Sequence, residues 1–317
     1  MKLIQHIEES KDTIISFEIL PPTKGKSIES IYGHLDPLME FNPSFVNVTY
    51  HRAEQVYKKR GDGSFERVEI RKRPGTVGIC ASIMNKYKVE AIPHLICGGF
   101  SKEETENALI DLHFLGIKNI LALRGDAAAN EKFFTPHPNG HRYAEDLVKQ
   151  VIDLNKGHYL EEDIMEGVKT DFCIGVAGYP EKHFEAPNLD TDIMYLKRKL
   201  DLGADYVTTQ MFFKNEHYYN FIARCKEHGI HVPIIPGLKP MTSRRQLTMI
   251  PSIFNVEVPV ALYDEMMKAK TDEAVEQIGE EWLLEQCKDL LKNKVPVLHF
   301  YTLGKPQVIY NVLRRLL

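Results

Sequence analysis

The stretch DLHFLGIKNILALRGD, residues Asp111–Asp126, decides the fold class. A segment of helical character ends at Gly116, and the short apolar run Asn119–Leu123 follows it. This run is too short for a helix and too apolar for a strand with one face in water. The same order recurs in Lys197–Phe212 and in Arg224–Leu238. Repeated units of this kind predict a parallel α/β fold.

About eight such strands are expected along the chain. They are Ile14–Phe17, Phe45–Val48, Ile92–Cys97, Asn119–Leu123, Phe172–Ala177, Tyr206–Phe212, Pro233–Pro236 and His299–Leu303. The chain has no G-x-G-x-x-G fingerprint and no P-loop, which disfavours a doubly wound sheet. We therefore expect one (β/α)8 TIM barrel over residues 1–317, with its longest loops at 51–69 and 127–143.

The composition narrows the possible functions. The chain of 317 residues is 43% hydrophobic and 26% charged, and its net charge of -4 disfavours a nucleic-acid surface. The chain has no run of about 18 apolar residues, so no membrane-spanning helix is expected. Acidic residues occupy the N-terminal stretch that would be apolar in a signal peptide. The five cysteines are scattered and form no CxxC, which is typical of reduced cytoplasmic thiols. Thirteen histidines include no HExxH, so no metal site is expected.

Polar side chains follow the expected strands at the ends where barrel enzymes carry their sites. In ISFEILPP, an apolar run carries one glutamate, Glu18, near its end and then stops at two prolines. A carboxylate there either reaches solvent or is held in a site, since unpaired burial is costly and raises the pKa. The other strand ends carry Thr49, Tyr50, His94, Arg124, Gly125, Asp126, Tyr179, His183, Gln210, Tyr301 and Lys305.

Taken singly, these residues have plainer interpretations. His94 could be a hydrogen-bonded core histidine, and Arg124 and Asp126 could form a solvated pair. Arg198 and Lys199 could lie on the wet face of an amphipathic helix. Their convergence at one rim is what favours an enzyme site.

Nine segments, in order, resemble the methylenetetrahydrofolate reductases over nearly the whole chain. They are SFEILPP, FVNVTY, AIPHLIC, LALRGD, YAEDLV, AGYPEKH, LKRKLDLGADYVTTQMFF, IIPGLKP and HFYTL. The resemblance implies a barrel that binds FAD without a Rossmann domain. It also implies reduction of 5,10-methylenetetrahydrofolate to 5-methyltetrahydrofolate by ping-pong hydride transfer through flavin N5, with NADH or NADPH as electron donor.

The resemblance also implies roles for single residues. Glu18 matches the general acid that protonates N10 of the substrate, a task for which we expect a raised pKa. Asp126 matches a catalytic carboxylate near flavin and pterin. Substrate contacts fall on Asp126, Gln210, Gln246, Tyr301 and Lys305. The FAD positions are Thr49, Tyr50, Arg52, His94, Arg124, Gly125, Asp126, Tyr143, Ala144, Tyr179, His183, Asp192, Arg198 and Lys199, the last two beside the diphosphate.

Five positions depart from the family's pattern. Gly304-Lys305 replaces Asn-Arg, Ile250 replaces an aromatic residue, and Tyr195 replaces an asparagine. Arg52 lies in TYHR, where some members have a small-residue turn. Because the chain ends soon after the eighth strand, no regulatory domain is expected.

Two rival functions stay open. One is a flavin-free barrel lyase or methyltransferase, and the other is a flavin-binding subunit that needs a partner for electron transfer. The sequence does not choose between NADH and NADPH. We expect small-molecule substrates, a homo-oligomer, and neither a nucleic-acid nor a membrane partner.

Overall fold

A closed barrel forms the centre of the computed structural model, which describes residues 1–128, 131, 133–165, 167–302 and 304–317. Within the described residues, its strands are all parallel. Around the barrel they are β1 (Ile14–Ile19), β10 (Val297–Tyr301), β9 (Ile234–Leu238), β8 (Tyr206–Met211), β7 (Cys173–Gly178), β6 (Asn119–Leu123), β5 (Glu90–Ile96) and β2 (Phe45–Val48). The expected (β/α)8 barrel is confirmed.

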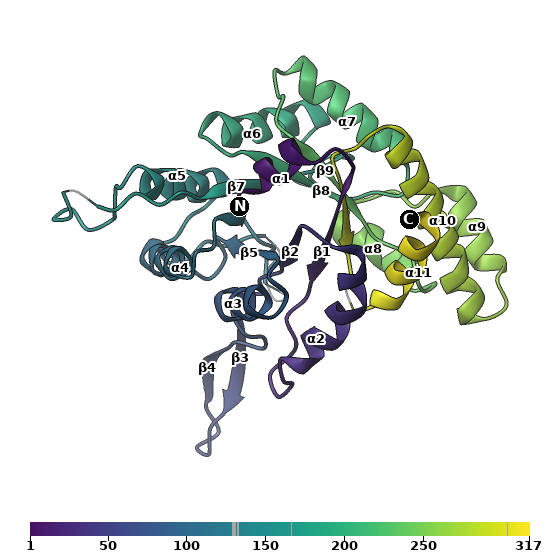
Figure 1. Cartoon of the computed structure of the whole chain (residues 1–317). Helices are drawn as coiled ribbons and strands as arrows, with labels where there is room; N and C mark the ends of the chain where they lie inside the picture. Colours follow the sequence, from purple (N-terminus) through teal and green to yellow (C-terminus); the bar gives the residue numbers. More distant parts are fainter. Residues whose placement is uncertain (129–130, 132, 166, 303) are drawn as a thin grey trace.

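Helices form the outer layer (Figure 1). They are α2 (Glu29–Leu35), α3 (Thr76–Tyr87), α4 (Lys102–Phe114), α5 (Ala144–Asn155), α6 (Leu189–Asp201), α7 (Asn215–Glu227), α10 (Asp272–Lys292) and α11 (Pro306–Leu316). A 3-10 helix, Asp36–Phe41, follows α2. Two further helices, α8 (Gln246–Phe254) and α9 (Val260–Lys268), occupy the long connection after β9.

The short helix α1 (Leu3–Glu9) covers the N-terminal end of the barrel. Its Leu3 packs in an apolar cluster with the first residues of five strands, Ile14, Phe45, Cys173, Tyr206 and Val297. The backbone N–H of Leu3 also donates to Asn119 Oδ1 at 2.7 Å. This end is therefore filled mainly by apolar side chains, with Asn119 as a buried polar residue that bonds to α1.

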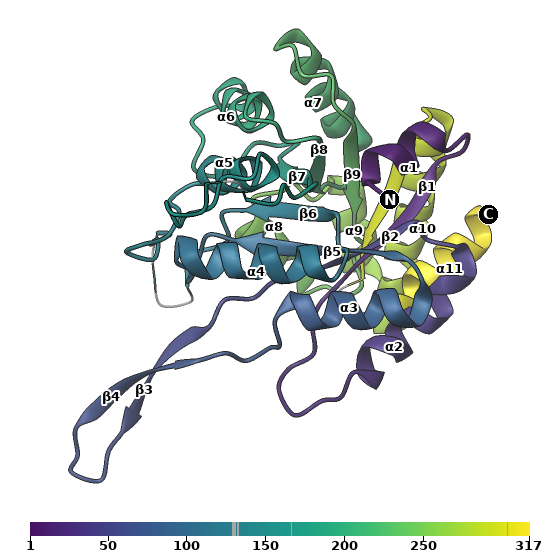
Figure 2. The same ribbon diagram turned by 60° about the vertical axis from the view of Figure 1, so that its left-hand side comes forward.

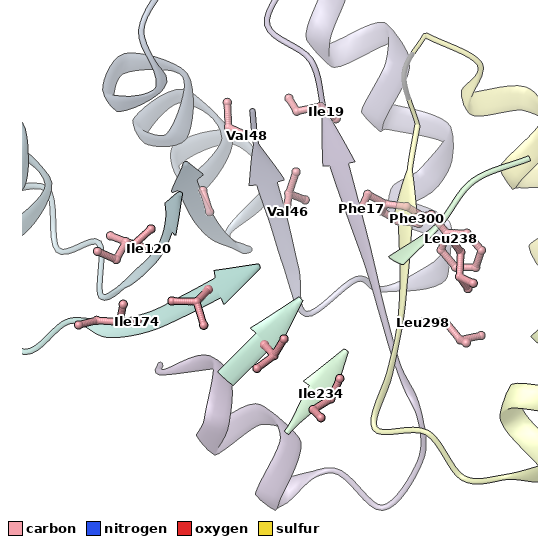
Figure 3. Packing of buried hydrophobic residues seen from close by; sticks show 14 of the residues in the cluster. Phe17, Ile19, Val46, Val48, Ile120, Ile174, Ile234, Leu238, Leu298 and Phe300 are labelled. Atoms are coloured by element: carbon pink, nitrogen blue, oxygen red, sulfur yellow. The ribbon is translucent and has the colours of Figure 1, made fainter. Parts of the chain in front are cut away.

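Strand alternation sets the direction of the side chains in β1. Figure 3 shows Phe17 and Ile19 in the main apolar cluster, where the strands pack against the helices. Ile14 belongs instead to the inner cluster beneath α1. With a period of two, Ser16 and Glu18 share the inward face with Ile14. Both faces of the strand are buried, so this alternation is hidden in the apolar sequence.

Some expected boundaries shift. β1 runs to Ile19, so Glu18 lies within the strand rather than after it. β10 covers Val297–Tyr301, two residues earlier than expected, and Leu303 lies outside the described residues.

The expected loop at 51–69 is wrong for most of its length. It contains an antiparallel hairpin of β3 (Glu54–Lys59) and β4 (Phe65–Ile70), which projects away from the barrel in both views (Figures 1 and 2). Its turn uses Gly63 at φ 86°, and Asp62 Oδ1 accepts from Ser64 N at 2.9 Å. Many charged residues obscured the strand pattern. In the other expected loop, 127–143, the described residues form neither helix nor strand.

Candidate functional site

Glu18 lies at the centre of a polar cluster inside the mouth of the barrel. Its side chain is buried, and the residue is 6% exposed. The Thr49 hydroxyl, just beyond β2, donates to Glu18 Oε1 at 2.9 Å. His94 Nε2 from β5 and His299 Nε2 from β10 each lie 3.5 Å from Glu18 Oε2. Three strands thus bring two imidazoles and a hydroxyl to one carboxylate.

A second set of contacts holds the two imidazoles. Ser16 Oγ lies 2.8 Å from His299 Nδ1, and Asn47 Nδ2 lies 3.4 Å from His94 Nε2. If the Ser16 hydroxyl donates to Nδ1, then His299 Nε2 carries the ring proton and faces Glu18. Sequence reasoning missed Ser16, Asn47 and His299. A period of two, by which Ser16 shares a strand face with Glu18 and His299 shares one with Tyr301, was the only signal, and it was hidden because both faces of these strands are buried.

The pKa of Glu18 runs opposite to expectation. Burial raises it, but His94, His299 and the Thr49 hydroxyl together lower it more, so the pKa lies below its ordinary value. The expected raised pKa is therefore wrong for this arrangement, because desolvation was considered without the partners. Burial also lowers the pKa of His94, while Glu18 raises it. Near neutral pH the cluster accordingly holds a carboxylate beside a neutral His94.

Asp126 is an exposed carboxylate after β6, at the same rim. Burial raises the pKa of Tyr179, and the charges of Asp192 and Asp126 raise it further. Burial lowers the pKa of His51, which Arg73 also lowers, whereas Asp126 and Glu18 raise it. His51 therefore lies within electrostatic reach of both predicted catalytic carboxylates. It was not among the predicted site residues.

Two predicted cofactor arginines are held by carboxylates that the sequence did not pair with them. Arg124 makes two hydrogen bonds to Glu185, at 2.5 and 3.0 Å, and its guanidinium lies 5.0 Å from the Phe134 ring centroid. Arg52 Nη2 donates to Glu131 Oε2 at 2.8 Å. Both arginines are fixed at the rim, and an anionic cofactor would compete with these ion pairs.

A compact polar group joins β7 to α6. His183 lies 4.8 Å from the Tyr179 ring centroid, and its backbone N–H donates to Asp192 Oδ2 at 2.8 Å. Lys199 Nζ donates to the Ala177 carbonyl at 3.0 Å. Burial lowers the pKa of Lys199 to about 8, while the charge of Asp192 raises it. The wet-face interpretation is therefore wrong for Lys199.

The neighbouring residue, Arg198, does lie on the solvent-exposed face of the helix. Arg198 is exposed on α6, with its guanidinium 5.3 Å from the Tyr195 ring centroid. Among the described residues it makes no ion pair that would occupy its donors. It is available to an anion, but it lies on the outer face of the helix.

The remaining predicted residues are more scattered. Tyr301 donates its hydroxyl to the Thr209 carbonyl at 2.6 Å, beside the cluster. Gln210 and Gln246 use their side-chain oxygens locally, accepting from Met211 N and Thr242 N. Lys305 forms an ion pair with Glu276 of α10 at 2.7 Å.

Three more predicted cofactor positions lie around the rim. Tyr50 contacts Phe100 edge-on at 5.1 Å. Tyr143 is exposed and caps α5, which Ala144 begins. Gly125 has φ 83°, a conformation that suits glycine.

A cluster of possible metal ligands lies outside the mouth of the barrel, and no histidine motif in the sequence predicts it. Ligand atoms of Glu181, His217 and Glu257 all lie within 4.8 Å of one another. Lys214 pairs with Glu257, and Glu257 N donates to Glu181 Oε2 at 2.6 Å. An ammonium group thus already neutralises part of this acidic cluster, and we assign it no metal.

In the described part of the chain, no helix has the length and apolar character needed to cross a bilayer.

Comparison with known proteins agrees with the geometry. A sequence model of the methylenetetrahydrofolate reductase family matches residues 2–317. The chain is 31% identical over 313 residues to methylenetetrahydrofolate reductase 1 of Schizosaccharomyces pombe, covering 98% of this chain and 47% of that protein. It is 32% identical over 303 residues to 5,10-methylenetetrahydrofolate reductase of Pectobacterium carotovorum subsp. carotovorum, covering 94% and 88%. The chain thus spans about half the length of the eukaryotic relatives that it matches.

A solved structure shares the fold. It is an uncharacterized protein from Clostridium thermocellum that binds two copies of 5-methyl-5,6,7,8-tetrahydrofolic acid, with a TM-score of 0.59 and 16% identity. The match covers 98% of this chain and 96% of that one. At 16% identity it supports only the barrel fold. The family is shown by the sequence match over residues 2–317. This chain therefore belongs to the methylenetetrahydrofolate reductase family.

Proposed function

We propose that the chain reduces 5,10-methylenetetrahydrofolate to 5-methyltetrahydrofolate, with FAD as its cofactor and NADH or NADPH as the electron donor. The observation that carries this proposal is the buried Glu18 carboxylate, which lies between His94 and His299 at the mouth of a barrel of this family. The reaction needs a proton at a ring nitrogen of the substrate and an environment that excludes water. A buried carboxylate with two imidazole neighbours supports both requirements.

The residues at the rim fit a cofactor with a diphosphate. Lys199 is an ammonium buried beside Asp192, and its only described hydrogen-bond acceptor is the Ala177 carbonyl. A buried cation with so little compensation favours an anionic ligand. Arg198 could reach a diphosphate from the exposed side of the same helix, and His183 and Tyr179 could flank it. FAD, when bound, supplies the hydride-carrying ring system.

Within this proposal, Glu18 delivers a proton to the substrate nitrogen, and a neighbouring histidine then reprotonates Glu18. The pKa of Glu18 is lowered, so the isolated carboxylate holds no proton near neutral pH. His299 Nε2 and His94 Nε2 both face Glu18 Oε2, but Asn47 Nδ2 donates to His94 Nε2, so His299, whose Nε2 carries the proton when the Ser16 hydroxyl donates to Nδ1, is the imidazole that can pass a proton to Glu18. Covering the mouth with ligand removes remaining water and favours the neutral carboxylic acid. Thr49 fixes the carboxylate through Oε1 and leaves Oε2 to the histidines.

The test separates the two half-reactions. Glu18→Gln should keep FAD and still be bleached by a nicotinamide under anaerobic conditions. Its reoxidation by methylenetetrahydrofolate should slow by about 100-fold or more, the usual contribution of a positioned acid. Glu90→Gln is the matched control, since Glu90 begins β5 at the opposite end of the barrel. A folate half-reaction of near wild-type rate in Glu18→Gln would contradict the assignment.

The same preparation distinguishes the rivals. No flavin on extraction would favour a flavin-free lyase or methyltransferase. Bound FAD that neither NADH nor NADPH can reduce would favour a subunit that depends on a partner for electrons.

A further inference from the structure

A cavity of about 530 Å³ lies beside the barrel mouth rather than in it. It is bounded by the loop after β1, by α2, by the first turn of α3 and by α4, and the base of the β3–β4 hairpin closes one side. Figures 1 and 2 show α3 between α4 and α2, with the hairpin leaving beside α3. Among the described residues matched to FAD and folate, Tyr50 alone lines this cavity. The cavity is therefore separate from the proposed catalytic centre, with Tyr50 at the boundary.

The body of the cavity is apolar. Ile31, Ile79, Leu95 and Ile96 are buried residues that line it, and the Tyr50 and Phe100 rings meet edge-on at its wall. The volume falls in the range of small-molecule sites, about 300–1,000 Å³. Two aromatic rings and branched aliphatic side chains suit a flat apolar group.

One side of the cavity is positively charged. Lys26 and Arg71 both line it, are exposed, and make no ion pair within the described residues. Two acids act electrostatically on Tyr50 at this cavity, Glu104 and Glu69. Glu104 is engaged in the capping box of α4 with Ser101, and within the described residues Glu69 forms no ion pair with Lys26 or Arg71. The cations are therefore not neutralised by a bonded partner.

The N-terminus of α3 adds to this charge. Thr76, Val77 and Gly78 line the cavity and form the first turn of this 12-residue helix. The N-cap, Gly75, offers no side-chain acceptor, and the first turn contains no acid. Its free N–H groups and the helix dipole favour an anion at this end of the cavity, where Arg71 Nη1 lies 3.7 Å from the position a Cβ would take on Gly75.

We propose that this cavity is a binding site for a small molecule with a flat apolar body and one anionic group. The body would lie against Leu95, Ile96 and the Tyr50 and Phe100 rings, with the anion at Arg71, Lys26 and the start of α3. Its occupant would touch Tyr50, whose chain neighbour Thr49 bonds to Glu18. The site is thus next to the catalytic cluster without being part of it.

The test uses two dyes on the FAD-loaded protein. 8-Anilinonaphthalene-1-sulfonate has an apolar ring system and one sulfonate, and N-phenyl-1-naphthylamine has the same ring system without charge. Both should bind with saturable fluorescence at one site per chain. Ala108→Phe, which fills the cavity from α4, should abolish both signals. Ser82→Phe fills it from α3 and serves if the first variant does not fold. Retained FAD and an unchanged circular dichroism spectrum establish folding.

The charge is tested separately, on the exposed side chain of Arg71. Arg71→Gln should weaken binding of the sulfonate dye about tenfold, the worth of one charge-assisted contact near solvent, and leave the neutral dye unchanged. Arg67→Gln removes an exposed arginine from the hairpin away from the cavity and should change neither dye. Unaltered dye binding in folded Ala108→Phe or Ser82→Phe would overturn the site. Equal effects of Arg71→Gln and Arg67→Gln on the sulfonate dye would overturn its anionic specificity.

Discussion

Lys199→Met should stabilise the FAD-free protein and lower its affinity for FAD. Burial lowers the pKa of Lys199 from 10.5 to about 8. At about 1.4 kcal/mol per pKa unit, the buried charge costs about 3 kcal/mol as an upper limit. Its partly exposed stem reduces this, and Asp192 loses a cationic neighbour in the variant. We therefore expect a net gain in the free energy of unfolding of about 1 kcal/mol at pH 7.

The pH dependence has a definite sign. Between about pH 8 and 10.5 the unfolded wild type binds a proton at Lys199 that the folded protein has released. Wild-type stability therefore rises with pH across this window, whereas the variant, which has no titratable group at this position, gains nothing. The advantage of the variant should fall by about 1–3 kcal/mol between pH 7 and pH 10.5. Urea unfolding of FAD-free protein at both pH values measures this change.

FAD affinity should move in the opposite direction. Loss of a buried charge-assisted contact to the diphosphate should weaken FAD binding about 10- to 100-fold, measured by quenching of flavin fluorescence. Lys197→Met is the control, because Lys197 pairs with Asp201 on the exposed side of the same helix. An unchanged FAD affinity in Lys199→Met would refute the diphosphate assignment. If the difference in the free energy of unfolding between variant and wild type were the same at both pH values, the assignment of a buried charge to Lys199 would be wrong.

Three further changes test other parts of the site. Asp126→Asn should raise the reduction potential of the bound flavin and slow the folate half-reaction, because negative charge near the ring disfavours reduction; a potential that stays or falls would show that this carboxylate does not face the flavin. Arg198→Ala should barely change the melting temperature of FAD-free protein, since Arg198 is exposed over Tyr195, yet should release FAD on dilution; retained flavin would leave Arg198 without a ligand role. Gly237→Ala should lower the free energy of unfolding by about 1–3 kcal/mol or more in urea, because a Cβ would come within 2.3 Å of the Thr209 carbonyl oxygen and 2.6 Å of the Tyr301 ring; wild-type stability would mean that the β8 backbone and Tyr301 both shift without cost.

The sequence by itself determined the barrel, and it did so through local signals. Helix-ending glycines such as Gly116, each followed by a short apolar run, are read within about 16 residues, and their repetition indicates parallel β/α units. A carboxylate near the end of a strand, Glu18, was also visible locally, because the two prolines that follow Leu20 stop the ladder, although the strand itself runs to Ile19. Motif order then identified the family, which the match over residues 2–317 confirms.

Only the tertiary structure decided what surrounds Glu18. His94 and His299 come from strands far apart in the chain, and closure of the barrel brings both within 3.5 Å of one oxygen. Their presence reverses the direction of the Glu18 pKa, which burial alone would raise. The strand faces were unreadable because both sides of each strand are buried, so apolar residues occur without visible alternation.

The same reason explains the unexpected partners at the rim. Arg124 meets Glu185 and Arg52 meets Glu131 across separate loops, a pairing that depends on where the loops return to the barrel. Local sequence places most strands to within a few residues, because capping and chain-breaking act over short stretches of chain. The contacts of a charged side chain depend on residues far away in the chain, and these meet only when the sheet closes.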